Sequence, residues 1–599
     1  MWASLWKRVF GIDLRTLALF RVMLAITCIT EVFLLWPNLF AFFDDHGIFM
    51  RKDAVIQSSP YAWSLYYIDG SVGWAYLLFC LTLLAGIALL FGYRTRLAIV
   101  ICWVLSVSLT NRISIFSSGA HMLLPLLLFW AMFLPLGARF SVDAALSDAP
   151  KGDNSYVSAG TFAALLQMGI LYLFSALLKT GASWHDAANA IYYVTNTPEM
   201  STPLGAYLGQ WLKLTQWLTR YVYHLEFIAP IFLFSPIRTA CCRLAILPFL
   251  FTLHLGFALF ISIGFFPLVC ISGLVIFIPG LVWDKLLLWY NARKTRAGIT
   301  LYYDKDCGFC RKSCLIFREL GLPPETAIIP AQSRPDIYAI MQRENSWVVE
   351  DGSGHHRTRW DAVAWCWRRS PLLWPLGIIF LLPFMKPVGD LAYGFIARNR
   401  EKFGRMTARL LPECHRPLAF KPYLLTEIAA LYLIGMVAMC NINSLPGQVL
   451  ERVCSPLFPL LSTLKLTQNM KFFAPTPRHA TRWVVIEGHL ANGNVVDMFH
   501  NVPEAPSHDI PKNGYDAYPS HYWYKFFNRV NFNRWQSVLG SYYCQAWSDN
   551  HPGMPAKEAV FSVYEQVTPD LPATKPNPVK LVTSFTYDCN TKSVKENPK

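Results

Sequence analysis

The strongest chemical signal in this 599-residue sequence is a pair of cysteines separated by two residues, Cys307 and Cys310. The pair follows a strand-like run at 299–303 and precedes a stretch with helical periodicity. Cys307 is therefore expected at a helix N-terminus, where unpaired N–H groups and the helix dipole favour a thiolate. Arg311 and Lys312 add positive charge nearby. The pattern predicts a dithiol in which Cys307 attacks and Cys310 resolves the mixed disulfide.

Two other interpretations of the cysteine pair are open. It could be half of a zinc site, which needs further ligands at suitable spacing, or it could be inert. Redox chemistry is preferred because the available ligands are irregularly spaced, and no metal site is predicted. Cys314, one turn further along, is a third thiol. The candidates for further zinc ligands are Cys366, Cys414, His355, His356 and His415.

A second group of reactive residues lies inside or at the ends of long apolar segments. A charged side chain within a bilayer costs at least about 2.5–3.5 kcal/mol, so each of these residues invites a functional interpretation. In the predicted topology Arg21 lies deepest inside, and the other five converge on the outer half. Burial disfavours an ammonium ion, so Lys179 could act as a base near neutral pH. The residues are Arg21, Glu31, His121, Lys179, Glu226 and His254.

Each of these residues also has a purely structural interpretation. Lys179 could extend to the interface, Glu226 could pair with a basic residue, and each histidine could bond a backbone carbonyl. Their convergence at one level favours acid–base chemistry in a dry pocket.

The composition favours a membrane protein as the framework for these residues. Hydrophobic residues make up 54% of the chain and charged residues 15%, whereas soluble domains carry about 25% charged residues. This balance excludes a disordered chain and an ordinary cytosolic enzyme. The segment 205–220 is amphipathic and is expected to lie in the interface. The predicted spans are 16–36, 73–92, 97–111, 120–136, 161–178, 221–235, 242–262, 265–285 and 423–440.

The distribution of positive charge predicts the orientation. Lys and Arg are denser in the set of short segments that includes the N-terminus, which is therefore predicted to be cytoplasmic. The net charge of +15 then reflects helix ends and not nucleic-acid binding. On this topology Cys307 lies in a reducing compartment, whereas Cys544 and Cys589 lie outside and could form a disulfide, as Cys454 could with either of them. The outside region has no Asn-x-Ser/Thr sequon, which favours a bacterial inner membrane.

Four ordered motifs between Leu301 and about Arg400 resemble the DCC family of thiol-disulfide oxidoreductases. The resemblance implies a thioredoxin-like fold, redox-active cysteines at positions 307 and 310, and a cytosolic thiol partner. The motifs are Tyr303-Asp304-x-Asp306-Cys307-x-x-Cys310, Val348-Val349-Glu350-Asp351-Gly352, Trp360-Asp361-Ala362 and Ile396-Ala397-x-Asn399-Arg400.

The apolar region at about 10–290 resembles the HTTM domain, which is shared with vitamin K-dependent gamma-carboxylase. In the carboxylase a lysine five residues before a tryptophan deprotonates reduced vitamin K, and Lys179 and Trp184 have this spacing. The motifs are Leu17-Ala18-Leu19-Phe20-Arg21, Phe42-Phe43-Asp44-Asp45-His46-Gly47, His121, Gln167 through Tyr172, Tyr192-Tyr193, Glu226-x-x-Ala229-Pro230, His254 and Ser262-Ile263-Gly264-Phe265-Phe266-Pro267.

This second resemblance implies a reduced, vitamin K-like quinone as cofactor. Lys179 would deprotonate the hydroquinone, oxygen would add, and the strong base formed would couple epoxidation to carbanion formation. His121, His254 and Glu226 are the further catalytic candidates. Trp184, Tyr172 and Arg21 are the candidate contacts of the quinone.

The expected fold class is a polytopic α-helical membrane bundle with a thioredoxin-like α/β domain and a C-terminal, mostly β, soluble domain. Asn492-Gly493 predicts a hairpin turn, and 371–385 is expected as a docked or re-entrant helix. The predicted regions are the bundle at 1–298, the dithiol domain at 299–400, a basic linker and last span at 401–440, and an extracytoplasmic domain at 441–599 whose tail after about 570 is loose.

The leading functional hypothesis is a membrane redox enzyme with carboxylase-like or epoxidase-like quinol chemistry and a cytoplasmic dithiol domain. The first alternative is a thiol-disulfide relay anchored by the bundle. The second is a scaffold or transporter without enzymatic activity. The expected partners are the lipid bilayer, a quinone and a cytosolic thiol protein. The C-terminal aromatics Tyr518, Trp523 and Tyr524 are interpreted as core, and no chemistry is predicted for the outside domain.

Overall fold

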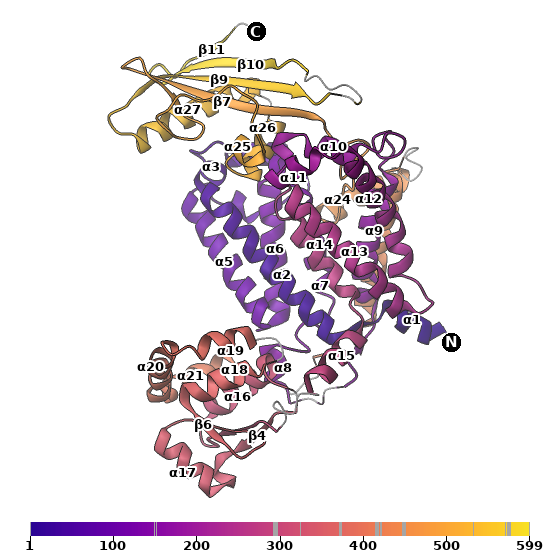
Figure 1. Cartoon of the computed structure of the whole chain (residues 1–599), viewed down its shortest axis with the longest axis vertical. Coiled ribbons are helices and arrows are strands. Elements are labelled where there is room, and N and C mark those ends of the chain that lie inside the picture. The colour runs from indigo at the N-terminus through magenta and orange to yellow at the C-terminus, as the bar shows by residue number, and fades with distance from the viewer. Residues whose placement is uncertain are drawn as a thin grey trace.

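The structure, a computed structural model, has three parts along one long axis (Figure 1). A helical bundle lies between a C-terminal, sheet-rich region and a small α/β domain, and we call its two ends the sheet end and the dithiol end. The structure describes residues 2–148, 150, 152–291, 298–323, 325–370, 374–413, 418–419, 422–445, 451–530, 532–569, 571 and 577–597.

The bundle is that of an integral membrane protein. Among the described residues, five helical segments are long and apolar enough to cross a membrane. A bent pair in the bundle, Phe266–Phe277 with Gly280–Trp289, would add one span, whereas a second bent pair, Trp374–Phe380 with Met385–Arg398, packs in the small domain. The five segments are Leu14–Phe43, which contains α2 (Leu14–Leu35) and α3 (Leu39–Phe43), then α5 (Val72–Phe91), α9 (Ala159–Leu177), α13 (Thr239–Phe260) and α22 (Leu424–Asn443).

Further helices complete the bundle and connect its spans. Those within it are α6 (Thr95–Arg112), α7 (Gly119–Ala131), α12 (Leu212–Leu233), α14 (Phe266–Leu274) and α15 (Gly280–Asn291). The short connecting helices are α1 (Trp2–Phe10), α4 (Arg51–Gln57), α8 (Val142–Ala145), α10 (Ala190–Thr195) and α11 (Pro203–Gly209).

Three predicted helical segments differ from the structure. The segment 205–220, expected as one amphipathic element, is divided between α11 and α12, and α12 starts at Leu212 and continues through most of the span predicted at 221–235. The span expected at 265–285 is broken between α14 and α15, which are bent by 84°. Pro279 stands at the break, and proline lacks the N–H that would continue a helix. The span expected at 120–136 ends at Ala131, and α7 has only 13 residues.

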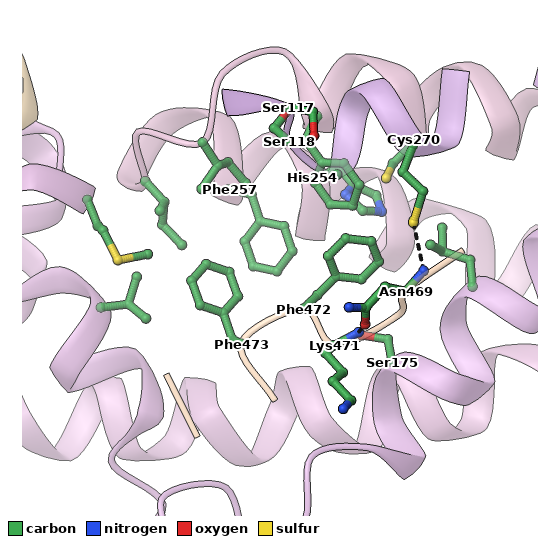
Figure 2. Close-up of a pocket in the computed structure, with 18 of the residues that line it drawn as sticks. Ser117, Ser118, Ser175, His254, Phe257, Cys270, Asn469, Lys471, Phe472 and Phe473 are labelled. Atoms are coloured by element: carbon green, nitrogen blue, oxygen red, sulfur yellow. Dashed lines mark hydrogen bonds between the residues drawn. The ribbon is translucent and has the colours of Figure 1, made fainter. Parts of the chain in front are cut away.

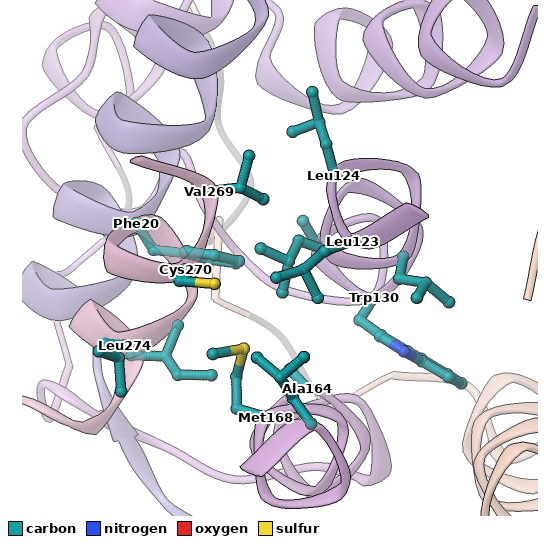
Figure 3. Close-up of a cluster of buried hydrophobic side chains, with 14 of the residues drawn as sticks. Phe20, Leu123, Leu124, Trp130, Ala164, Met168, Val269, Cys270 and Leu274 are labelled. Atoms are coloured by element: carbon teal, nitrogen blue, oxygen red, sulfur yellow. The ribbon is translucent and has the colours of Figure 1, made fainter. Parts of the chain in front are cut away.

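The core of the bundle lies where α2, α7, α9 and α14 meet (Figure 3). Because α7 contacts helices on several sides, apolar residues surround its whole circumference instead of forming one stripe. Gly273 allows α14 to approach α9 closely, since a Cβ there would lie 2.4 Å from Met168 Sδ. The labelled core residues are Phe20, Leu123, Leu124, Trp130, Ala164, Met168, Val269, Cys270 and Leu274.

The small domain contains a four-stranded mixed sheet in the order β4-β3-β5-β6. Its strands are β3 (Thr300–Tyr303), β4 (Ala327–Pro330), β5 (Val348–Glu350) and β6 (His356–Thr358). β3 and β4 are parallel, and the other pairs are antiparallel. With α16 (Gly308–Gly321) between β3 and β4, this is the predicted thioredoxin-like arrangement.

The remaining helices of this domain are α17 (Pro335–Glu344), α18 (Arg359–Arg368), α19 (Trp374–Phe380), α20 (Met385–Arg398) and α21 (Arg400–Leu410). The apolar helix α19 packs against α18, and α19 and α20 are bent by 99°. A docked helix was expected at 371–385, and its described part, α19, is docked.

The C-terminal region contains a five-stranded antiparallel sheet in the order β11-β10-β9-β7-β8. The predicted hairpin at Asn492-Gly493 joins β7 to β8. The expectation of a loose tail is wrong, because β10 and β11 follow residue 577 and β10 pairs with β9. The strands are β7 (Ala480–Leu490), β8 (Val495–Asp497), β9 (Ala556–Val567), β10 (Lys580–Asp588) and β11 (Val594–Glu596).

Helices attach this sheet to the bundle. They are α23 (Glu451–Cys454), α24 (Phe458–Thr463), α25 (Gly514–Ala517), α26 (His521–Arg529) and α27 (Phe532–Asn550). Phe42 of α3 packs against Trp523 and Phe526 of α26, with ring centroids 4.9 and 5.7 Å apart. Cys544 of α27 and Cys589, the pair proposed from the sequence, form a disulfide. The C-terminal region is therefore fused to the bundle by a shared aromatic core.

Candidate functional site

A cavity of about 680 Å³ lies at the sheet end of the bundle. Residues of α9, α12, α13 and α14 line it on the bundle side, and the segment 465–473 and α26 line it on the other. Figure 2 shows Ser175, His254 and Cys270 around the cavity together with Asn469 and Phe472 of that segment. The cavity thus forms between the membrane helices and the C-terminal region.

Lys179 lies in this cavity, two residues after the end of α9. Its ammonium group is ion-paired with the Glu226 carboxylate of α12 and donates to Ser175 Oγ at 2.8 Å. Ser175 Oγ in turn donates to Glu226 Oε2 at 2.9 Å. Lys179 is 2% and Glu226 6% exposed. The three side chains form a buried, hydrogen-bonded cluster, and Lys179 does not extend to the interface.

Trp184 forms part of the wall beside this cluster. Its ring centroid lies 4.9 Å from Lys179 Nζ, a cation–π distance. Its indole N–H donates to the Phe473 carbonyl at 2.9 Å. Gly181 makes this contact feasible, because a Cβ there would lie 2.2 Å from Thr476 Cγ2. The predicted spacing of Lys179 and Trp184 therefore brings both to one wall.

Tyr172 and His254 form a second polar pair in the cavity. The Tyr172 hydroxyl lies 2.7 Å from His254 Nε2. His254 Nδ1 and Gln468 Nε2 are buried and have no hydrogen-bond partner among the described residues. Both residues line the cavity, so a ligand could engage these two nitrogens.

The segment 465–473 and α26 contribute cavity residues that the sequence did not identify. Gln468 accepts from Gln167 Nε2 at 2.8 Å, which anchors the segment to α9. His521 and Tyr524 also line the cavity. Tyr524, which was interpreted from the sequence as a core residue, is therefore also part of the cavity wall. The basic residues of this wall are Lys465, Lys471, Arg478, Lys525 and Arg529. No local pattern around Gln468 and Phe473 shows that this segment returns to the bundle, so the sequence alone does not place it at the cavity.

Glu31 and His121 form a separate buried pair that does not line the cavity. His121 Nε2 lies 3.6 Å from Glu31 Oε1, and the Tyr522 hydroxyl lies 3.5 Å from the same nitrogen. The Ser118 backbone N–H donates to His121 Nδ1 at 3.0 Å, so the neutral ring carries its hydrogen on Nε2. Ser118 also lines the cavity, so it connects the Glu31–His121 pair with the residues around the cavity.

Arg21 lies away from the cavity, although it was considered as a quinone contact. Its guanidinium donates to four backbone carbonyls, including Leu136 O at 3.1 Å and Phe140 O at 2.6 Å. The Phe140 N–H donates to Glu319 of the small domain at 3.0 Å, so this group lies toward the dithiol end. Arg21 supplies hydrogen bonds to backbone carbonyls of the loop at 136–140 and is therefore placed to stabilise that loop.

At the dithiol end, Cys307 is the N-cap residue of α16, as predicted. Its sulfur accepts from the Cys310 N–H at 3.3 Å, and both cysteines are free and partly exposed. Hydrogen bonding from the Cys310 thiol, then from its N–H, and the nearby charge of Arg400 lower the pKa of Cys307 to about 6, against the opposing effect of burial. Burial raises the pKa of Cys314. Cys307 is the nucleophile that the geometry favours.

Arg311 and Lys312, which were expected to favour the Cys307 thiolate, instead contact residues at the end of α21 and just after it. Lys312 Nζ donates to Leu411 O at 2.8 Å, and Arg311 pairs with Glu413. Both contacts hold α16 against the end of α21. Arg400, the last residue of the fourth predicted motif, supplies the positive charge instead.

Among the described residues, no group of three His, Cys, Asp or Glu residues could hold a metal ion. Cys366 is buried in the small domain, and the ring of His356 lies near Glu350. Cys414 and His415 lie outside the described residues. The zinc interpretation therefore gains no support from the described part of the chain.

Two families match the chain, each over one of these centres. Residues 58–281 match the HTTM domain, and residues 301–406 match the DCC1-like thiol-disulfide oxidoreductase. No curated protein and no solved structure gives a significant match. The chain is thus a membrane redox protein that joins an HTTM domain to a DCC1-like thiol-disulfide oxidoreductase domain.

Proposed function

We propose that this protein is a membrane enzyme in which Lys179 deprotonates a hydroquinone bound in the cavity. The observation that carries the proposal is the buried Lys179–Glu226–Ser175 cluster in the wall of a cavity with aromatic lining. The carboxylase-like oxygenation and epoxidation implied by the HTTM resemblance are the finer form of the same proposal.

The cavity residues fit a hydroquinone. Phe257, Phe266 and Phe472 provide apolar walls for a ring. His254 Nδ1 and Gln468 Nε2 are unpartnered polar atoms for its oxygens. When bound, a hydroquinone supplies two phenolic protons and two electrons for dioxygen.

The residues of the chain handle the proton. Lys179 passes a proton from Nζ to Glu226 Oε2, directly or through Ser175 Oγ, and then accepts one from a phenolic hydroxyl at the freed Nζ. Because the pair is buried, proton transfer within it leaves two neutral groups, which a dry environment tolerates better than an isolated charge. Trp184 covers the amine and excludes water.

The test is oxygen uptake by the full-length protein in lipid nanodiscs with benzohydroquinone and naphthohydroquinone substrates. Lys179→Met is expected to lower the rate about 100-fold or more, the usual contribution of a positioned base. Lys213→Met, an exposed lysine on α12, is the matched control. Full activity of Lys179→Met, or no activity of the unmodified protein with either substrate class, contradicts the proposal.

We infer a second reaction at the other end, thiol-disulfide exchange. Cys307 thiolate attacks a partner disulfide, a new S–S bond forms and the partner bond breaks. Cys310 then displaces the partner sulfur, so that the protein dithiol is oxidised and the partner disulfide is reduced to two thiols. The N-cap position of Cys307 carries this inference.

Trapping tests this second reaction. Cys310→Ser should accumulate a mixed disulfide with a thiol protein, and Cys307→Ser should not. Equal trapping by the two variants, or none by Cys310→Ser under oxidising conditions, contradicts the assigned roles.

We also propose that the dithiol end faces the cytoplasm of a bacterial cell and that the C-terminal sheet faces outside. The charge distribution supports this orientation, as does the Cys544–Cys589 disulfide at the sheet end. Labelling of intact cells with a membrane-impermeant maleimide should reach a cysteine introduced at Lys512 and should not reach Cys307. The reverse labelling pattern contradicts the orientation.

A further inference from the structure

The cavity carries far more positive than negative charge. Six basic side chains and one acidic side chain, Glu226, line it. Lys179 neutralises Glu226. The other five basic residues come from the segment 465–478 and from α26, so the excess charge is concentrated on the wall that the C-terminal region contributes.

Most of these cations lack a carboxylate partner among the described residues. Lys465 donates to the Asn111 side-chain oxygen at 2.7 Å, and Arg529 donates to the carbonyls of Ile115 and Ser117. Lys525 lies over the ring of Tyr524. Arg478 differs, because the described residues include two acidic neighbours for it, Glu565 at 3.7 Å and Glu199. The cluster is therefore held in place by neutral groups, which leave its charge uncompensated.

Lys525, Arg529 and Arg478 are close enough for their charges to repel one another. Lys465, Lys525 and Arg529 all interact electrostatically with the neighbouring His121. Burial, and then the charges of Arg529 and Arg478, lower the pKa of Lys525 to about 8, and burial does the same for Lys465. Gathering like charges in a partly dry cavity costs free energy, and an anion in the cavity removes that cost.

The cavity opens beside this cluster. Three of its lining residues are exposed, namely Asn469, Lys471 and Arg529. A charged group can therefore enter from this side while an attached apolar group reaches Phe257, Phe266 and Phe472. The buried end of the same cavity holds Lys179 and His254.

We propose that Lys465, Lys525 and Arg529, with Lys471 at the opening, form a subsite for an oxyanion, so that the cavity binds a ligand with a carboxylate or phosphate at one end and an apolar ring at the other. Ammonium and guanidinium groups recognise both anions through charge-assisted hydrogen bonds. The subsite lies on a different wall from the cluster of Lys179, Glu226 and Ser175 and does not depend on the proposed role of Lys179.

Binding of small aromatic probes to the purified full-length protein tests this subsite. Calorimetric titrations compare benzoate, phenyl phosphate and neutral benzamide, which share the ring and differ in the attached group. At least one anionic probe should bind about tenfold or more tightly than benzamide, the effect of one charge-assisted contact. Preference for benzoate identifies a carboxylate ligand, and preference for phenyl phosphate identifies a phosphate ligand. Equal binding of all three, or no binding of either anion at millimolar concentration, overturns the proposal.

Variants locate the site. Lys525→Gln and Arg529→Gln should each weaken the anionic probe about tenfold and leave benzamide unchanged, whereas Lys512→Gln, an exposed lysine outside the cavity, should change neither. Lys471→Gln, on the exposed rim, gives the same test without altering a buried position. Unchanged anion affinity in Lys525→Gln and Lys471→Gln overturns the assignment. Retained anion binding in Lys179→Met shows that the subsite stands even if the proposed quinol chemistry fails.

Discussion

The cavity takes its lining from residues as distant in the chain as Thr110 and Arg529, whereas the dithiol centre takes both of its cysteines from the first turn of α16. The first centre is enclosed by bundle helices and the C-terminal region, and its key lysine is buried. The second is partly exposed, and hydrogen bonds from the Cys310 thiol and N–H, together with the charge of Arg400, lower the pKa of Cys307. The enclosed centre therefore depends on the whole fold, and the exposed one depends mainly on a single helix end.

The largest expected effect comes from breaking the ion pair of the cavity. Glu226→Gln leaves the buried Lys179 without its counter-charge, which should cost about 3–5 kcal/mol of unfolding free energy and lower quinol oxidation strongly. The double variant Lys179→Met/Glu226→Gln should recover most of the stability and none of the activity. Denaturation monitored in detergent measures the first quantity. An unfolding midpoint of Glu226→Gln equal to that of the unmodified protein contradicts the structural role of the pair.

The next effect tests whether the C-terminal region completes the cavity. Gly181→Val would force side-chain atoms onto Pro475 and Thr476, since even a Cβ lies 2.7 Å from Pro475 O. Overpacking costs about 1–3 kcal/mol, and the displaced wall should lower quinol oxidation at least tenfold. Gly256→Val on α13, where a Cβ meets nothing within 4 Å, is the control. Thiol exchange should be the same in both variants, and a loss of it in Gly181→Val contradicts the separation of the two centres.

A smaller effect tests the dithiol end. Alkylation of Cys307 should rise with pH around its pKa of about 6, far below the pKa of an ordinary thiol, because the thiolate is the reactive form. Arg400→Gln removes a charge that stabilises the thiolate, so the midpoint should move to higher pH. Arg311→Gln should leave it unchanged, since that residue pairs with Glu413. Iodoacetamide kinetics, with alkylated Cys307 quantified by mass spectrometry in the reduced protein that retains Cys310, measure the profile. A larger midpoint shift in Arg311→Gln than in Arg400→Gln contradicts the assignment of Arg400.

The smallest effect is a pH dependence of anion binding at the cavity. Lys525 and Lys465 must be protonated to attract an anion, and their pKa values are lowered to about 8. Affinity for the preferred anionic probe should therefore decline as the pH rises through about 8, from its full value at lower pH, and fall several-fold at higher pH. The titratable groups around these lysines are Arg478, Arg529, His121, His521 and Tyr524. Of these groups, the arginines stay charged between pH 7 and 9.5. Constant affinity from pH 7 to 9.5 contradicts a contribution from either lysine.

Features that depend on residues close together in the sequence were predicted correctly. The strand, Cys307 cap and α16 followed from a motif within some twenty residues, and the hairpin at Asn492-Gly493 followed from its turn. Among the described residues, five of the nine predicted spans are helices long and apolar enough to cross a membrane, and Pro279 breaks the one expected at 265–285. The segment 205–220 is divided between α11 and the start of α12. Hydropathy alone could not show these breaks, because buried and lipid-facing apolar residues look alike in sequence.

The sequence could not predict which distant segments meet. Lys179, Glu226 and His254 were identified as intramembrane charges, and the structure groups them in one cavity while it places Glu31 and His121 beside it. Lys465, Lys525 and Arg529 were missed because they look like ordinary solvated residues. Only the re-entry of the segment 465–473, fixed by contacts such as Gln468 with Gln167, reveals their position.

The most direct test of two separate centres measures both reactions on both variants. Quinol-dependent oxygen uptake and mixed-disulfide exchange would be recorded for Lys179→Met and Cys307→Ser in the same nanodisc preparation. We expect Lys179→Met to lose only oxygen uptake and Cys307→Ser to lose only thiol exchange. Loss of oxygen uptake in Cys307→Ser, with Lys179→Met fully active, would contradict this expectation and place the chemistry at the dithiol end alone.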